Sequence, residues 1–435
     1  MRLLLLLACV ACAAQTNPSN EVFGRLRGLH GQSSVPKNTD ERVALFEGKL
    51  KDQPHSLQLL SGLASAFMQK VRETTDFAYL DRASSVVDRM LTEDPQNYDA
   101  LRLRIEIAMQ KHQFPVVVDK AQALIERNQS DSGVYGLLGD ALMELGKCQE
   151  AEVAYKRMLE LAPGLPSYNR MAYQRFVTGN PDEALAWMGQ AVEAGSPSGE
   201  NQAWALVEFG DLLFKSGRMK EAEAAYRRAQ VAVPGYHRAA GALGRLLAAK
   251  GEVDAAVVSY RLAQSAVPLP EYAAALARLA VNKGNTAEAK RQTELVDAVE
   301  KLMRAYGEKA NRTLALIYAD DNRNLARSLE IAQGEFEVRD DVYSYDALSW
   351  ALYKNGKISE AREASLRALA LKTPEPLFYF HAGMIALASG AREEARVSLQ
   401  RALALNPSFD FVHAPEARRA LAKTLANEPA VAARN

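Results

Sequence analysis

The chain has 435 residues, and its 53 Lys and Arg equal its 53 Asp and Glu, so its formal net charge is zero. A protein that binds nucleic acid usually carries a basic excess that displaces counterions from phosphate, and this chain has none. Leu, Ala, Arg and Glu dominate, and Gly and Pro recur at intervals, which favours helices over strands.

The first fourteen residues have the order of a secretory leader. Arg2 precedes an apolar run from Leu3, and small residues follow up to Ala14. This order predicts a signal peptide over 1–14 and export to the periplasm or another part of the cell envelope. Cys9 and Cys12 each follow an alanine, a pattern similar to a bacterial lipoprotein signal. Anchoring to the membrane through an acylated Cys9 or Cys12 is therefore an alternative.

The segment after this leader is polar and rich in Gly, Pro, Ser and Asn. It predicts a flexible linker over 15–38. A helical pattern over 39–55 then predicts an N-terminal capping helix.

Three linked columns of small residues recur along the rest of the chain. A glycine stands seven residues after a small residue and five residues before an alanine. These turn glycines are Gly146, Gly179, Gly217, Gly251, Gly284, Gly356 and Gly390. An apolar-periodic segment lies on each side of every turn glycine, which predicts two antiparallel helices joined by a tight turn. Pairs of this kind bury their apolar faces only by stacking, so the array is the folding unit.

The columns resemble the tetratricopeptide repeat family, whose helix–turn–helix unit has about 34 residues. The unit that matches best carries Tyr135, Leu138, Gly139, Leu142, Gly146, Ala151, Tyr155 and Pro163. One earlier unit has His112 where the family has glycine. The resemblance implies an all-α, right-handed superhelical solenoid of about ten repeats over 56–408, with 409–435 as a C-terminal capping helix and tail.

The sequence contains none of the motifs searched for that mark a metal site, a phosphate-binding loop or a catalytic nucleophile. The six histidines include no pair at the i, i+4 spacing of a helical metal site, and no phosphate-binding loop or nucleophile elbow is present. The sequence therefore predicts no catalytic residue, no metal ligand and no cofactor. An enzyme stays an alternative, for which His381 would have to lie near a carboxylate.

The family resemblance implies that the first helix of each repeat lines a concave groove in which a peptide lies. The residues one and four positions after each small residue are then expected to point into this groove. The candidate peptide-groove residues are Asp140, Met143, Tyr173, Phe176, Asp211, Phe214, Arg245, Arg278, Trp350 and Tyr353. Their order runs from acidic through aromatic to basic and apolar, which suits a peptide or helix laid lengthwise. Packing of the aromatic rings between repeats is the alternative, above all for Trp350 and Tyr353.

These observations favour a non-catalytic protein–protein interaction scaffold or adaptor. Two segments, 343–353 and 379–384, resemble a C-terminal pattern of bacterial tetratricopeptide proteins, which points to a bacterial origin. Repeats that clamp the tail of a chaperone carry Asn and Lys in the groove, where this chain has Asp140, Tyr173 and Asp211. A carbohydrate or cell-wall binder is another alternative, which requires Tyr173, Phe176 and Phe214 to be exposed in a line.

Overall fold

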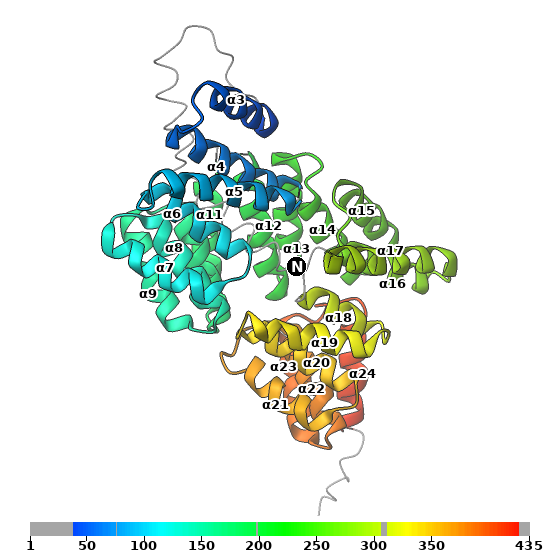
Figure 1. Cartoon of the computed structure of the whole chain (residues 1–435). Helices are drawn as coiled ribbons and strands as arrows, with labels where there is room; N and C mark the ends of the chain where they lie inside the picture. Colours follow the sequence, from blue (N-terminus) through cyan, green and yellow to red (C-terminus); the bar gives the residue numbers. More distant parts are fainter. Residues whose placement is uncertain (1–37, 75, 197–198, 306–310, 426–435) are drawn as a thin grey trace, which may run out of the picture. The chain divides into compact units, whose positions relative to one another are not determined.

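The computed structural model describes residues 38–74, 76–196, 199–305 and 311–425 (Figure 1). All the regular secondary structure in these ranges is helical, as the predicted fold class requires. None of their helices is both long enough and apolar enough to cross a membrane. The predicted signal peptide, the linker up to residue 37 and the tail from residue 426 lie outside the described residues.

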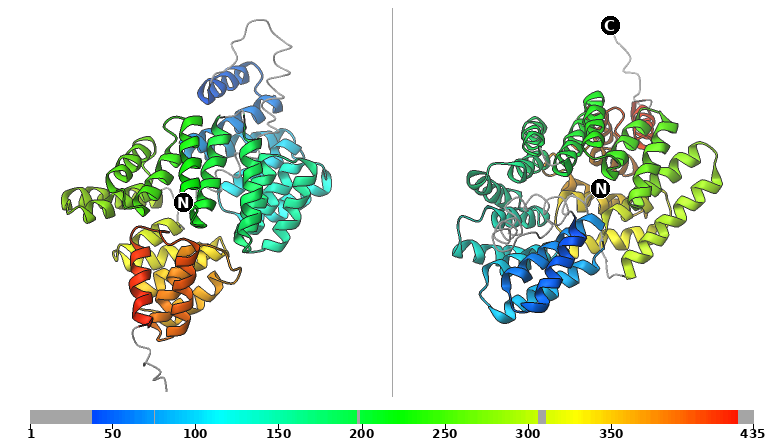
Figure 2. Two further views of the ribbon diagram at one scale, coloured as in Figure 1. Left: turned by 180° about the vertical axis from the view of Figure 1, so that it is seen from behind. Right: turned by 90° about the horizontal axis from the view of Figure 1, so that it is seen from above.

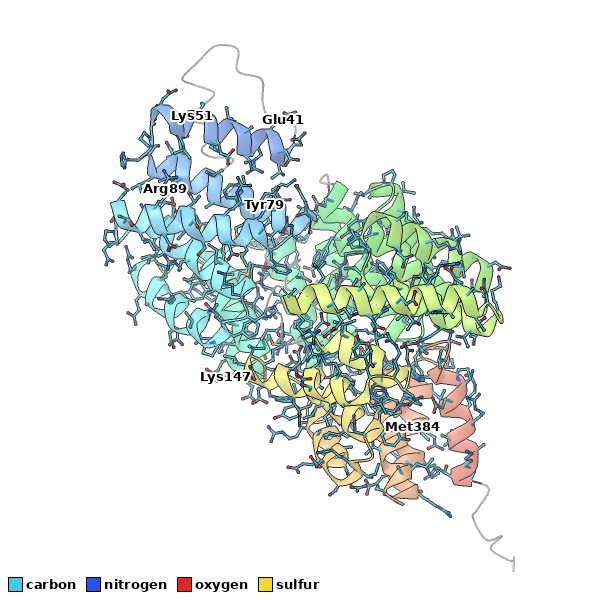
Figure 3. All side chains as sticks on the ribbon, turned by 45° about the vertical axis from the view of Figure 1, so that its right-hand side comes forward. Glu41, Lys51, Tyr79, Arg89, Lys147 and Met384 are labelled. Atoms are coloured by element: carbon cyan, nitrogen blue, oxygen red, sulfur yellow. The ribbon has the colours of Figure 1, made fainter. Side chains whose placement is uncertain are left out.

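The chain divides into two compact units, one ending at Arg170 and the other beginning at Met171. The first unit starts with α3 (Thr39–Asp52), in which the side chain of Asn38 accepts a hydrogen bond from the Glu41 amide (2.9 Å). Glu41 in the first turn and Lys51 in the last turn complement the helix dipole (Figure 3). Phe46 of α3 is fully buried against Gly62, so this helix covers the first pair.

The remaining helices follow one another as pairs. In the first unit these are α4 (Leu57–Thr74) and α5 (Ala78–Glu93), α6 (Tyr98–Gln110) and α7 (Phe114–Arg127), and α8 (Ser132–Glu144) and α9 (Cys148–Leu161). Each helix packs on the next one along the chain, and α4, α6 and α8 also contact one another in succession. The first unit is therefore a stack of antiparallel pairs, which is the predicted arrangement.

The second unit continues the same plan (Figure 2). The pairs are α10 (Leu165–Val177, shared with the first unit) and α11 (Pro181–Ala194), α12 (Gly199–Lys215) and α13 (Met219–Ala232), α14 (His237–Ala249) and α15 (Val253–Ala266), α16 (Pro270–Asn282) and α17 (Thr286–Ala305), α18 (Arg312–Asp320) and α19 (Leu325–Gly334), α20 (Val342–Lys354) and α21 (Ile358–Ala368), and α22 (Pro376–Ala388) and α23 (Arg392–Leu405). A short 3₁₀ turn (Glu335–Glu337) follows α19, and α24 (His413–Leu425) packs on the last pair.

The turn glycines all adopt left-handed backbone conformations, with φ from 71° at Gly284 to 88° at Gly179. The amide after each glycine bonds to a carbonyl five residues earlier, as Lys147 does with Leu142 (2.8 Å). This is the Schellman arrangement, which satisfies carbonyl groups left over at the end of the first helix. The glycine column therefore has the backbone role that its spacing predicts.

Where the small residue before a turn glycine is itself a glycine, it lies under a large side chain of the same repeat. A Cβ atom at Gly244 would lie 2.9 Å from the ring of Tyr260, and one at Gly383 would lie 2.7 Å from Leu399. Gly139 meets Tyr155 in the same way. These large side chains close the crossing of the two helices within their own repeat. Tyr226 and Tyr260 also contact the first helix of the next repeat, through Arg245 and Tyr272.

Candidate functional site

The ten candidate peptide-groove residues all lie on the first helices of their pairs. Asp140, Met143, Phe176, Asp211, Phe214 and Trp350 are buried, and Tyr173, Arg245, Arg278 and Tyr353 are half-buried. None of the ten is exposed. Intramolecular partners account for much of this burial, and they divide the set into local clusters.

In the first unit, Asp140 of α8 is the centre of a buried polar cluster. The hydroxyl of Tyr155 donates to its Oδ1 (2.9 Å), and Arg170 donates to both carboxylate oxygens (2.9 and 2.7 Å). Arg170 is fully buried and comes from the first helix of the next repeat. The two-pronged contact fixes the spacing between these repeats, since a guanidinium and a carboxylate meet in one planar geometry.

The second unit repeats this arrangement around Asp211 of α12. The hydroxyl of Tyr226 donates to Asp211 (2.7 Å), and Arg245 of α14 donates to the same carboxylate (2.6 Å). Burial and the charge of Asp211 raise the pKa of Tyr226 well above its usual value. The guanidinium of Arg245 also lies 4.8 Å from the ring centroid of Phe214. Two of the charged residues predicted to form a gradient along the groove, Asp211 and Arg245, are therefore partners of each other.

Further along the second unit, residues of four helices meet at the half-buried carboxylate of Asp320 on α18. Trp350 of α20 donates from Nε1 to its Oδ1 (2.7 Å), and His413 of α24 lies 3.2 Å away. Arg278 of α16 approaches the other carboxylate oxygen and also donates to Asp321 (2.7 Å). Burial is the largest influence on the pKa of His413 and by itself would lower it. The charge of Asp320, together with hydrogen bonding to Asp320 and Glu416 and the charge of Asp410, outweighs burial and raises this pKa to about 10. Trp350 therefore packs between repeats, which is the alternative to a place in the groove.

His381 of α22 does lie near a carboxylate, as the enzyme alternative requires. Its Nδ1 is 2.9 Å from Asp346 of α20, and burial raises the pKa of that carboxyl group. The imidazole stacks on Trp350 with ring centroids 4.2 Å apart, and it is only 2% exposed. A substrate has no access to this pair in the structure. Within the described residues, no three His, Cys, Asp or Glu side chains are grouped so that they could hold a metal ion.

The chain also folds back on the ends of two of its own first helices. Thr373 donates from Oγ1 to the carbonyl of Val177 at the end of α10 (2.6 Å). Asn406 donates from Nδ2 to the carbonyl of Phe214 near the end of α12 (2.7 Å). Lys215 pairs with Glu375 (2.8 Å) while its ammonium group lies 4.9 Å from the ring centroid of Phe176. We call residues 371–375 and 405–406, with these contacts, the clasp.

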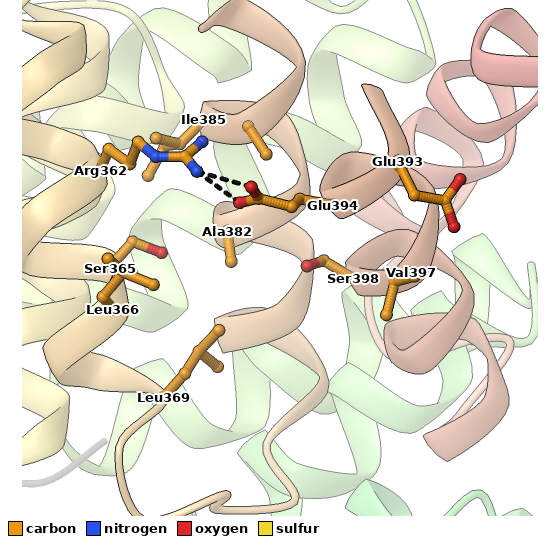
Figure 4. A pocket seen from close by; sticks show the side chains of 11 residues that line it. Arg362, Ser365, Leu366, Leu369, Ala382, Ile385, Glu393, Glu394, Val397 and Ser398 are labelled. Carbon is orange, nitrogen blue, oxygen red and sulfur yellow. Dashed lines mark hydrogen bonds and ion pairs between the residues drawn. The ribbon is translucent and has the colours of Figure 1, made fainter. Parts of the chain in front are cut away.

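A separate hollow of about 260 Å³ lies between α21, α22 and α23 (Figure 4). Its walls are mostly apolar, with Leu366 and Ile385 among them, and the ion pair between Arg362 and Glu394 (2.6 Å) crosses its rim. None of the candidate peptide-groove residues lines it.

The partners that organise these clusters were not predicted. Arg170, His413, Thr373, Glu375 and Asn406 lie outside the columns that carry the repeat, so spacing alone does not mark them. The spacing of the columns predicts contacts between neighbouring helices only. Thr373 and Val177, which form a hydrogen bond, are 196 residues apart in sequence. A polar side chain on a first helix, such as Arg170, can be identified as the partner of a buried charge only once its own burial is known.

Three sequence profiles described as "Tetratricopeptide repeat" match the chain, over four ranges. They cover residues 132–164, 165–230, and both 207–269 and 347–408. The chain carries tetratricopeptide repeats. Tetratricopeptide repeats typically form non-catalytic scaffolds for interactions between proteins, which does not exclude a catalytic activity.

Solved structures show partial similarity to this chain. MamA is 23% identical over 39% of this chain and 98% of its own, with a TM-score of 0.33. PilW, described as a widely conserved type IV pilus biogenesis factor, is 20% identical over 56% of this chain and 92% of its own, with a TM-score of 0.33. A tetratricopeptide repeat protein from Parabacteroides merdae is 18% identical over 60% and 98%, with a TM-score of 0.34. No curated protein matches the chain.

Proposed function

We propose that this chain is an exported interaction scaffold, which holds a peptide or helix of a partner protein along the first helices of its repeats. The observation that carries the proposal is the tetratricopeptide array itself, matched over 132–269 and 347–408. Its first helices gather aromatic side chains beside cations, as in the contacts of Phe176 with Lys215 and of Phe214 with Arg245. Aromatic and arginine side chains supply most of the binding energy in protein interfaces.

Half-buried aromatic residues are the part of this surface best suited to a partner. Tyr173 and Tyr353 keep exposed area on the first helices α10 and α20. Phe176 and Phe214 are 2% and 4% exposed, so they do not form the exposed aromatic line that a carbohydrate binder requires. The surface therefore favours a peptide over a glycan.

A display library of peptides, selected against the full chain, tests this proposal. We expect a shared motif among the selected peptides, and we expect Tyr173→Ala to weaken the binding of a synthetic copy at least tenfold by calorimetry. Val231→Ala is the matched control, because Val231 is 82% exposed on the second helix α13. A library that yields no binder, or binding that both variants leave unchanged, would contradict the proposal.

We place this function in the bacterial cell envelope on the strength of the leader over residues 1–14. Fractionation of cells that express the chain with and without these residues tests this placement. Export requires the leader, and the product should move to the cytoplasm when it is removed. If a lipid holds the chain, substitution of Cys9 and Cys12 by serine releases it from the membrane fraction; if neither change alters its location, the placement is wrong.

A further inference from the structure

In the described part of the second unit, the clasp covers two of the turns that contain a turn glycine. A Cβ atom at Gly179 would lie 3.2 Å from the carbonyl oxygen of Leu371, and one at Gly217 would lie 2.9 Å from that of Leu405. Cβ atoms at the other turn glycines of the second unit would meet nothing within 4 Å, namely at Gly251, Gly284, Gly356 and Gly390. The backbone of the clasp therefore packs against the turns that follow α10 and α12. We call this surface the edge of α10 and α12.

The clasp binds this edge through the backbone of both helices. The last carbonyl groups of a helix have no partner within it, so they are open to donors from outside. Thr373 and Asn406 both meet this need with a single side-chain donor, and both are fully buried. Each stands directly before a proline, Pro374 or Pro407, which presents no amide of its own. Across Pro374 the Glu375 amide donates to the Thr373 carbonyl (2.8 Å), which forms a tight turn.

The third contact of the clasp is electrostatic. Lys215 and Glu375 are 14% and 11% exposed in their side chains, and the ammonium group of Lys215 also faces the ring of Phe176. A largely buried ion pair selects its partner more strictly than one on the surface. If one partner is replaced, the other charge stays buried without a counterion, which costs free energy. The edge thus combines carbonyl groups at the ends of two helices, a cation and an aromatic ring, all on first helices that carry candidate peptide-groove residues. The Phe214 carbonyl accepts from the Gly217 amide (3.0 Å) as well as from the clasp.

We propose that this edge of α10 and α12 is a docking site for a peptide with a hydroxyl residue, a proline and a carboxylate in the order of Thr373, Pro374 and Glu375, and that the clasp is its resident occupant, displaced by a partner. The inference rests on the proposed function, for which it names the class of peptide. The clasp is part of the same chain, so it competes at a high effective concentration and keeps the edge closed until a stronger segment arrives.

A labelled peptide with the sequence of residues 370–377 tests the inference in the full chain. Glu375→Lys places a second cation beside Lys215, so the clasp should open and the peptide should bind at least tenfold more tightly than to the wild type. The double variant Lys215→Glu/Glu375→Lys restores the ion pair, closes the clasp and returns binding to the wild-type level. Glu393→Lys is the control, because its side chain is 70% exposed and lies outside the clasp.

The same titration contains the results that would overturn the inference. Equal binding to the wild type and to Glu375→Lys means that the clasp does not compete. No binding to a folded Glu375→Lys chain, as judged by circular dichroism, means that the edge is no docking site. If Glu375→Lys does not fold, Thr373→Val replaces it, because it removes one hydrogen bond at nearly constant shape.

The peptide itself supplies a second discrimination. Replacing its threonine by valine, or its glutamate by glutamine, should weaken binding to the opened chain about tenfold.

Peptides selected from the display library separate the two proposals. If such a peptide binds wild type and Glu375→Lys equally and lacks the hydroxyl–proline–carboxylate order, the scaffold function stands and this inference fails. If the library yields no binder at all, the scaffold function fails, while the titration still reports on the clasp.

Discussion

Nine turns between paired helices contain a residue with a left-handed backbone in the described part of the chain. Seven carry the turn glycines, and the others carry His112 and Asn322 with φ of 55° and 48°. The amide after each of these two residues bonds five residues back, as Gln113 does with Ala108 (3.0 Å). The geometry is therefore the same with and without glycine. The sequence marks His112 by its place in the column, but Asn322 lies in a repeat too divergent to align.

Substitution at a turn glycine tests the backbone part of this account. Gly356 has φ of 75° and open space around it, so Gly356→Ala adds strain without a clash. We expect it to lower the free energy of unfolding by about 1 to 2 kcal/mol. Gly189 lies inside α11 with equal space, and Gly189→Ala should raise that free energy by about 0.5 to 1 kcal/mol. Urea unfolding of both variants measures the difference, and effects of the same sign would contradict the assignment.

At the scale of helices, buried charge pairs link one repeat to the next. Asp140 with Arg170 and Asp211 with Arg245 both join a first helix to the next first helix along the chain. The positions of Asp140, Asp211 and Arg245 follow from the repeat, but their pairing does not. A charged residue one position after the crossing glycine is compatible with a groove or with a contact, and burial decides between the two. Here burial makes them structural links, and their peptide-binding role stays a prediction.

Removal of one partner measures the strength of such a link. Asp211→Asn leaves Arg245 and Tyr226 without the carboxylate, and should cost about 3 kcal/mol of unfolding free energy. In the double variant Asp211→Asn/Arg245→Met the loss should shrink, because no uncompensated charge remains. Asp254→Asn is the control, since this side chain is 89% exposed and should change the free energy by less than about 1 kcal/mol. Equal costs for Asp211→Asn and Asp254→Asn would rule out a buried link.

At the scale of the second unit, contacts distant in sequence close the array on itself. The contact of His413 with Asp320 and the clasp join residues that are not in neighbouring repeats. The repeat predicts how one pair stacks on the next, and it predicts the all-α solenoid that the structure has. It carries no information on which distant loops meet, because that depends on small rotations added over several repeats.

The pair of His413 and Asp320 makes stability depend on pH in a defined direction. A free histidine loses its proton near pH 6.5, whereas His413 in the folded chain, with its pKa raised to about 10, holds the proton to higher pH. The contribution is therefore complete below pH 6.5 and is lost as the pH rises towards 10. We expect His413→Gln to cost about 3 kcal/mol at pH 6 and clearly less at pH 9.5 by urea unfolding. His55→Gln, at a largely exposed histidine, is the control, and a cost for His413→Gln that is the same at both pH values would refute the pairing.

Hydrogen exchange of the full chain, with and without a peptide selected from the display library, tests the central claim most directly. An interaction scaffold of this kind should show slowed exchange on the first helices α10, α12 and α14, and faster exchange at residues 371–375 as the clasp leaves its edge. Protection confined to the second helices α11, α13 and α15, or no change on any helix at saturating peptide, would contradict the claim that the first helices carry the partner.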